Sequence, residues 1–141
     1  MRRLLTAALF AALLLVLGCG KRDEPPTVQD KLKAMQKAHE YIHAHGSGLY
    51  LVEYSGHSMA HTMGTQGGIL AYDPGHPYDQ LAKGDVVIFW DTAAQSLVAH
   101  ELVMQRGQSW ITAGNNNSIV DGTWLTLDNY RGKVVRHFAF R

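Results

Sequence analysis

The chain contains one cysteine, Cys19, among its 141 residues. A single thiol excludes an internal disulfide framework and any zinc site built mainly from cysteine. An excess of charge of one sign is also missing, because 13 lysine and arginine residues are balanced by 12 aspartate and glutamate residues. This balance argues against nucleic acid as a partner. The length allows one compact domain but not two, so function must be sought in local motifs.

Long apolar runs are absent except for one, which extends from Leu4 to Gly18 and follows Arg2 and Arg3. As a helix this run would reach only about 22 Å, whereas the hydrocarbon core of a bilayer is roughly 30 Å thick. A basic start followed by a short apolar segment is typical of an export signal. Residues 1–18 are therefore expected to be a signal peptide rather than a spanning helix.

The signal peptide ends in Leu17-Gly18-Cys19, which resembles the lipoprotein box of bacteria. The resemblance implies that Cys19 is lipidated and becomes the first residue of a protein anchored in the cell envelope. Gly20 stands where an aspartate would favour retention in the inner membrane, which implies the periplasmic side of the outer membrane in a Gram-negative cell. The alternative is an ordinary signal peptide with an incidental Cys19, which leaves an unpaired thiol in an exported protein.

Residues 19–26 are charged and end in two prolines, a composition typical of a tether. An amphipathic helix is expected over residues 27–46, where Thr27 and Asp30 form a capping-box motif and Gly46 provides a stop. Its apolar residues recur at helical spacing: Val28, Leu32, Met35 and Ile42. Its lysines form either a solvated face or a contact with anionic headgroups: Lys31, Lys33 and Lys37.

Short apolar runs separated by turn residues predict a mainly β domain over residues 47–141. The expected strands cover residues 49–54, 69–72, 86–90, 97–104, 110–112, 123–127 and 133–138. Glycine, proline and aspartate lie between most of these runs, for example in Asp73-Pro74-Gly75 and Asp121-Gly122. The aromatic residues in or beside the strands are expected to pack in the core: Tyr50, Trp90, Trp110 and Trp124.

Ser58 is the candidate nucleophile, because it follows the first expected strand in a turn that also contains Gly56, His57 and Met59. At such a position a hydroxyl can reach the surface beside backbone N–H groups that would stabilise an oxyanion. The alternative is a serine that only caps or closes the turn. A serine hydroxyl needs an adjacent base to act as a nucleophile near neutral pH.

Histidine is the expected base, because the only lysine between Lys37 and Lys133 is Lys83, which lies in a polar turn. Strand alternation places His100 on the same face as Val98, Leu102 and Met104. A buried core histidine is the alternative interpretation of His100. Asp121 is the one carboxylate in the following polar loop and can orient the imidazole, or it can simply accept hydrogen bonds in the turn before Gly122.

Five colinear blocks between about Tyr50 and Val135 resemble the signal peptidase and LexA-like serine peptidase superfamily, and within it the archaeal and endoplasmic-reticulum type of signal peptidase I. The blocks are Gly56-x-Ser58-Met59-x-x-Thr62, Lys83-Gly84-Asp85-Val86-Val87-Ile88-Phe89, Val98-Ala99-His100-Glu101-Leu102-Val103, Thr112-x-Gly114-x-Asn116-Asn117 with Asp121, and Gly132-Lys133-Val134-Val135. The resemblance implies a mixed, coiled β-sheet and a serine endopeptidase that acts on an exported protein or peptide. It implies Ser58 as nucleophile, His100 as general base and Asp121 as orienting acid.

The resemblance further implies that Gly56, His57 and Met59 lie at the oxyanion hole and substrate cleft, and that no cofactor is needed. The chain departs from the family at His61, Ala113, Asn115 and Glu101. These departures motivate an alternative, an inactive peptidase-fold lipoprotein that serves as a binding or interaction module. A metal site made by His57, His61 and His100 is a further alternative that rests only on the abundance of histidine.

Overall fold

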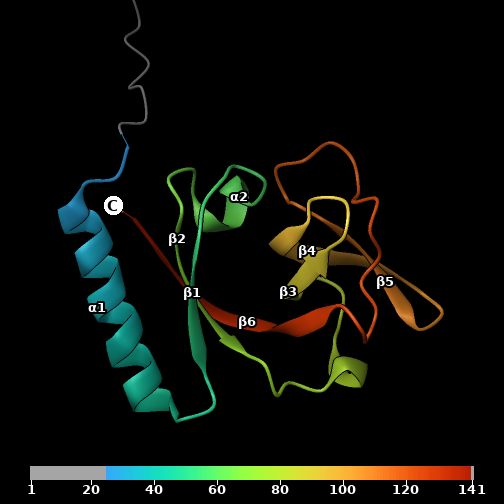
Figure 1. Ribbon diagram of the computed structural model, residues 1–141, viewed down its shortest axis with the longest axis horizontal. Helices are drawn as coiled ribbons and strands as arrows, with labels where there is room; N and C mark the ends of the chain where they lie inside the picture. The colour runs from blue at the N-terminus through green and yellow to red at the C-terminus, as the bar shows by residue number, and fades with distance from the viewer. Residues whose placement is uncertain (1–24, 141) are drawn as a thin grey trace, which may run out of the picture.

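The computed structural model describes residues 25–140, so residues 1–18, Cys19 and most of the tether lie outside the described residues. The protein is mainly β, with a six-stranded sheet and one long helix at its side (Figure 1). The elements are α1 (Val28–His45), β1 (Tyr50–Tyr54), α2 (Ala60–Met63), β2 (Gly68–Asp73), η1 (Tyr78–Gln80), β3 (Val86–Asp91), β4 (Ser96–Arg106), β5 (Ser109–Ala113) and β6 (Tyr130–Ala139). Within residues 25–140, no helix combines the length and the apolar composition that a membrane span needs.

The strand order is β1-β2-β6-β3-β4-β5, and all five pairings are antiparallel. The expectation of a mixed sheet is therefore wrong. β2 and β3 do run in the same direction, but β6 lies between them and is antiparallel to both. The last strand of the chain thus joins the β1–β2 half to the β3–β4–β5 half (Figure 1).

The helix α1 begins at the expected capping box, in which the Thr27 hydroxyl accepts from the Asp30 N–H and the Asp30 carboxylate accepts from the Thr27 N–H. Hydrogen bonds from Thr27 lower the pKa of Asp30. The helix packs on the sheet through Ala34 and Ala38, which are buried against Ile69 and Phe140. Alanine lets the helix axis approach the strands closely.

The two faces of the sheet are built from alternating residues of the same strands. Ile88 packs with Met59, Met63 and Leu70 in one buried cluster. Its neighbours in β3, Val87 and Phe89, pack in another with the residues Leu81, Leu102, Trp110 and Leu125. His100 of β4 lies opposite Val87 in the register. In β4, Leu102 belongs to the second cluster and Ala99 packs against the first, so the strand that carries this histidine is held by packing on both faces.

The expected strand over residues 123–127 does not form, and only Leu125 makes an isolated bridge, to Trp110. The side chain of Asn129 explains this, because it accepts from the Thr126 N–H and donates to the Trp124 carbonyl, which closes the segment into a turn. The expectation for the aromatic residues holds only for Trp110. In contrast, Tyr50, Trp90 and Trp124 are 58%, 40% and 49% exposed.

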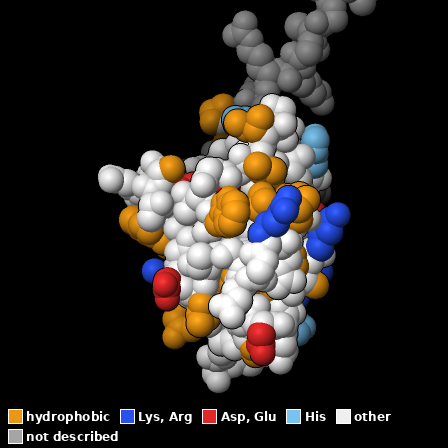
Figure 2. All heavy atoms as spheres, turned by 90° about the vertical axis from the view of Figure 1, so that its right-hand side faces the viewer, with side chains coloured by type: hydrophobic (Ala, Val, Ile, Leu, Met, Phe, Trp, Pro, Cys, Tyr) orange, Lys and Arg blue, Asp and Glu red, His pale blue; other side chains and the backbone are white. Residues whose placement is uncertain are grey.

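The β4 strand also departs from simple alternation. The register shifts between Leu102 and Met104, so Leu102 is buried whereas Met104 is exposed. A bulge of this kind bends the strand and changes the face to which later residues point. On the side of the molecule seen in Figure 2, apolar side chains lie scattered among polar groups, and the visible basic and acidic groups are interspersed with them.

A pair of leucines two residues apart tests how the segment after β5 contributes to stability. Leu125 is fully buried against Trp110, whereas Leu127 is 68% exposed. We expect Leu125→Ala to lower the free energy of unfolding by about 2–5 kcal/mol, because it leaves a cavity in the core. The control Leu127→Ala should change it by less than about 0.5 kcal/mol. Urea unfolding followed by tryptophan fluorescence measures the free energy of unfolding of both variants. Equal changes would contradict the burial of Leu125 against Trp110.

Candidate active site

The turn after β1 presents Ser58. Gly56 has φ of +114°, a conformation that a side chain disfavours, and it turns the chain away from the strand. The Ala60 N–H donates to the His57 carbonyl at 3.1 Å, and α2 then begins. Met59 points inward and is only 3% exposed, which leaves Ser58 partly accessible at the surface of the turn.

His100 lies within hydrogen-bond reach of Ser58. Its Nε2 is 3.0 Å from the Ser58 Oγ, across 42 residues of chain. The imidazole side chain is only 10% exposed, and Phe89 packs against it edge-on, with ring centroids 6.4 Å apart. The packing holds the ring in one orientation. The side chains that sequence reasoning placed together as base and nucleophile are thus neighbours.

Asp121 lies on the other side of the imidazole. His100 Nδ1 is 2.6 Å from the Asp121 Oδ2, and the carboxylate is 11% exposed. A carboxylate only accepts hydrogen bonds, so the proton of the neutral ring resides on Nδ1 and leaves Nε2 free to accept from the Ser58 hydroxyl. This is the tautomer that a general base needs.

Thr112 is a site residue for which sequence reasoning gave no role. Its fully buried hydroxyl donates to the same Asp121 Oδ2 at 2.6 Å, and the Asp121 N–H donates to the Thr112 carbonyl at 2.8 Å. Asp121 is therefore held by two hydrogen bonds to Thr112 of β5, one through its carboxylate and one through its backbone N–H, while the carboxylate also accepts from His100. The signals in the sequence were a threonine inside a short strand and its place at the start of the fourth block of the resemblance.

The loop that follows β5 docks directly on the nucleophile turn. The Asn116 N–H donates to the Ser58 carbonyl at 2.8 Å, and the Asn116 amide donates to the His57 carbonyl at 3.0 Å. Asn115 donates from its N–H to the Met59 sulfur at 3.3 Å and from its amide to the Thr62 hydroxyl. Asn115 therefore helps to fasten this loop to the turn.

Gly114 permits this close approach. A Cβ at this position would lie 2.7 Å from the Ser58 Cβ and 2.8 Å from the Asn117 side-chain nitrogen, closer than such atoms pack in proteins. It would also meet the Ser58 carbonyl oxygen. Any larger residue must therefore push the loop away from the turn, and with it Asp121.

A cleft of about 490 Å³ opens beside Ser58 and His100. Its apolar lining residues include Val52, Met59, Leu70, Ile88 and Ala99. Tyr54 also lines it and donates to the Met63 carbonyl. Burial raises the pKa of Tyr54 to about 12, so its hydroxyl stays protonated at neutral pH.

The cleft also contains a carboxylate, Asp91. Burial favours its neutral form, but hydrogen bonds from Thr123 and from the Ala93 and Ala94 N–H groups, together with the nearby His100, outweigh burial and lower the pKa of Asp91. Asp91 is therefore charged at neutral pH. It gives one part of the cleft a negative charge, in a lining that combines apolar residues with polar ones such as Glu53, Ser55 and Ser96.

Of the other predicted site residues, some line the cleft and some lie outside it. Gly56 and Met59 line the cleft, whereas His57 is exposed and contributes its carbonyl to the loop contacts. Lys83 is exposed in its turn and does not line the cleft. In the described part of the chain, no three His, Cys, Asp or Glu side chains are placed to hold a metal ion, so the metal site of His57, His61 and His100 does not form.

No protein-family model, curated protein or solved structure matches the chain.

The docking of the loop on the nucleophile turn can be tested with two glycines. We expect Gly114→Ala to separate Asp121 from His100, and therefore to abolish the low-field proton NMR resonance of a hydrogen-bonded imidazole Nδ1–H. Gly122→Ala is the control, because a Cβ at Gly122 meets nothing within 4 Å. This control should retain the resonance. An unchanged resonance in Gly114→Ala would mean that the loop does not position the carboxylate.

Proposed function

We propose that the protein is a membrane-anchored serine endopeptidase of the signal peptidase-like type, which cleaves an exported protein or peptide. The observation that carries this proposal is the hydrogen-bonded series from Asp121 through His100 to Ser58, with distances of 2.6 and 3.0 Å. Serine, histidine and aspartate occur along the chain in the order of the family that the sequence resembles. The adjacent cleft supplies room for a peptide.

In the proposed mechanism, Nε2 of His100 accepts the proton of the Ser58 hydroxyl as the oxygen attacks the scissile carbonyl. Asp121 stabilises the resulting imidazolium and keeps the ring in position, and Thr112 holds Asp121. The imidazolium then donates its proton to the leaving amine, whose bond to the carbonyl carbon breaks. Water, deprotonated by the same ring, releases the acyl group from Ser58.

Backbone N–H groups near Ser58 would bind the oxyanion. The Ser58 and Met59 N–H groups make no backbone hydrogen bond within residues 25–140, whereas the Ser58 carbonyl is occupied by Asn116. Free donors at the start of a helical turn beside the nucleophile are suited to a developing negative charge. Gly56 adds no side-chain donor, so this charge would be stabilised by the backbone alone.

The nucleophile can be identified by covalent labelling. We expect a fluorophosphonate to label the purified protein at Ser58, located by mass spectrometry of the modified peptide. Ser58→Ala should lose the label completely, and His100→Ala should slow labelling by about 10³-fold or more. Ser55→Ala is the matched control, since Ser55 lines the same cleft three residues earlier and should label at the normal rate. Failure of Ser58 to label, with exported proteins processed normally in a Ser58→Ala strain, would favour the inactive binding module.

The identity of the base can be tested by the pH dependence of labelling. A protonated imidazole cannot accept the Ser58 proton, so the labelling rate should fall as the solution is made more acidic and be level on the alkaline side. A Lys83→Ala variant should give the same profile, because that ammonium is exposed away from the cleft. A rate that continues to rise into alkaline pH would indicate a lysine base and remove His100 from this role.

A further inference from the structure

An apolar stripe runs along the exposed side of α1. Val28, Leu32 and Met35 are 76%, 64% and 37% exposed. Their spacing of four and three residues places them on one face of the helix, over its first two turns. The structure therefore leaves the largest apolar side chains of this part of the helix facing outward.

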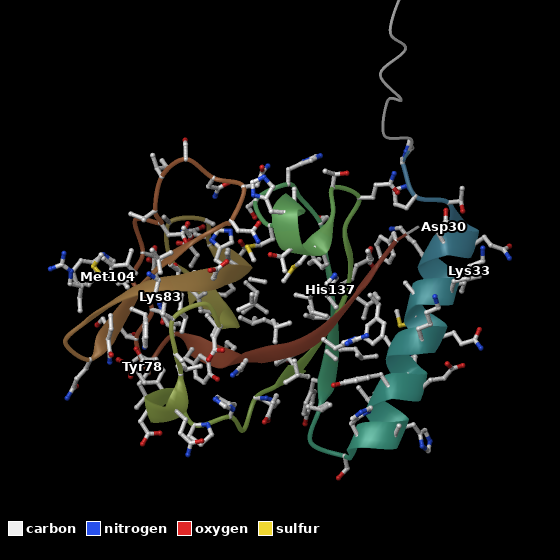
Figure 3. All side chains as sticks on the ribbon, turned by 180° about the vertical axis from the view of Figure 1, so that it is seen from behind. Asp30, Lys33, Tyr78, Lys83, Met104 and His137 are labelled. Atoms are coloured by element: carbon white, nitrogen blue, oxygen red, sulfur yellow. The ribbon has the colours of Figure 1, made fainter. Side chains whose placement is uncertain are left out.

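The fold does not use this stripe. The helix packs on the sheet through Ala34 and Ala38, and Lys31 adds an ion pair of 3.0 Å with Glu53 and a position over the Phe140 ring. On another side of the helix, Lys33 points away from the sheet (Figure 3). The exposed apolar residues are therefore contiguous along the helix, and such a stripe on an otherwise well-packed element marks a contact with something outside the domain.

The length of the tether limits what that contact can be. Val28 lies nine positions after Cys19 along the chain, with eight residues between them. Fully extended, this stretch spans at most about 30 Å. If Cys19 carries a lipid, the first turn of α1 cannot be farther than this from the bilayer surface. Asp30, near the start of the stripe, lies at the end of α1 that the tether joins (Figure 3).

We propose that Val28, Leu32 and Met35 insert into the boundary between headgroups and acyl chains of the membrane, so that α1 lies on the bilayer as an interfacial helix. This inference rests on the lipid anchor of the proposed function. Because α1 is packed on the sheet, the contact sets the orientation of the whole domain and the distance of the Ser58 cleft from the membrane. The anchor alone would leave the domain free to rotate.

The size of the stripe argues against a second copy of the chain as its partner. Three side chains offer roughly 300–400 Å², whereas a stable dimer buries roughly 800 Å² on each partner. A lipid surface requires no such area, because the covalent anchor already holds the protein at the membrane and a few apolar side chains then decide the orientation.

The test uses full-length lipidated protein in vesicles of phosphatidylethanolamine and phosphatidylglycerol. Cys19 is the only cysteine and is blocked by its lipid, so one introduced cysteine can carry an environment-sensitive fluorophore. We expect fluorophores at Leu32→Cys and Met35→Cys to shift to shorter wavelength and to be quenched by nitroxide lipids at least about twofold more than at Lys33→Cys. Lys33 is the matched control one residue away on the polar side, and Leu127→Cys, which is exposed outside α1, should also remain in water.

Each other outcome overturns the inference. Equal quenching at residues 32 and 33 would mean that the stripe does not contact lipid. Self-quenching that grows with protein density, without quenching by nitroxide lipids, would indicate a second copy. An N-terminal peptide that carries no lipid by mass spectrometry would remove the anchor, whereas fluorophosphonate labelling of Ser58 in the same sample reports on the peptidase separately.

Discussion

The hydrogen bond between His100 and Asp121 is the constraint on which the rest of the site depends. It fixes the ring tautomer, and only then can Nε2 accept from Ser58. Both side chains are nearly buried, so the contact forms only if β4 and the loop after β5 are placed to within a few tenths of an ångström. The packing of Phe89 and the hydroxyl of Thr112 supply that precision from either side.

The loop after β5 contacts two other parts of the site, the imidazole of His100 and the turn that holds Ser58. Its end carries Asp121 to the imidazole, while its first residues bind the turn that holds Ser58. A glycine at position 114 is the physical condition for this double contact, because no side chain fits there. Asn115, a departure from the family that the sequence resembles, contributes hydrogen bonds to the turn. This departure is thus compatible with an assembled site.

In α1, the residues that pack on the sheet are not the large apolar residues of the helix. Small residues, Ala34 and Ala38, face the sheet, and the larger apolar residues of the first turns face outward. Alanine contributes little apolar area but lets the helix pack closely. The helix is therefore stabilised on the sheet without its apolar stripe, which remains available to a surface near the tether.

The sequence by itself determined the mainly β class, six of the seven expected strands, the capping box at Thr27, and the three residue types of the candidate site, because these depend on local periodicity and on motif spacing. It could not determine which face of α1 is buried, since alanine and leucine are both compatible with a core. Nor could it predict that β6 inserts between β2 and β3, that Asn129 turns residues 123–127 out of the sheet, or that Thr112 holds Asp121. Each of these depends on contacts between residues that come together only when distant strands pair. Such contacts produce no repeating pattern in the amino-acid sequence from which they could be predicted.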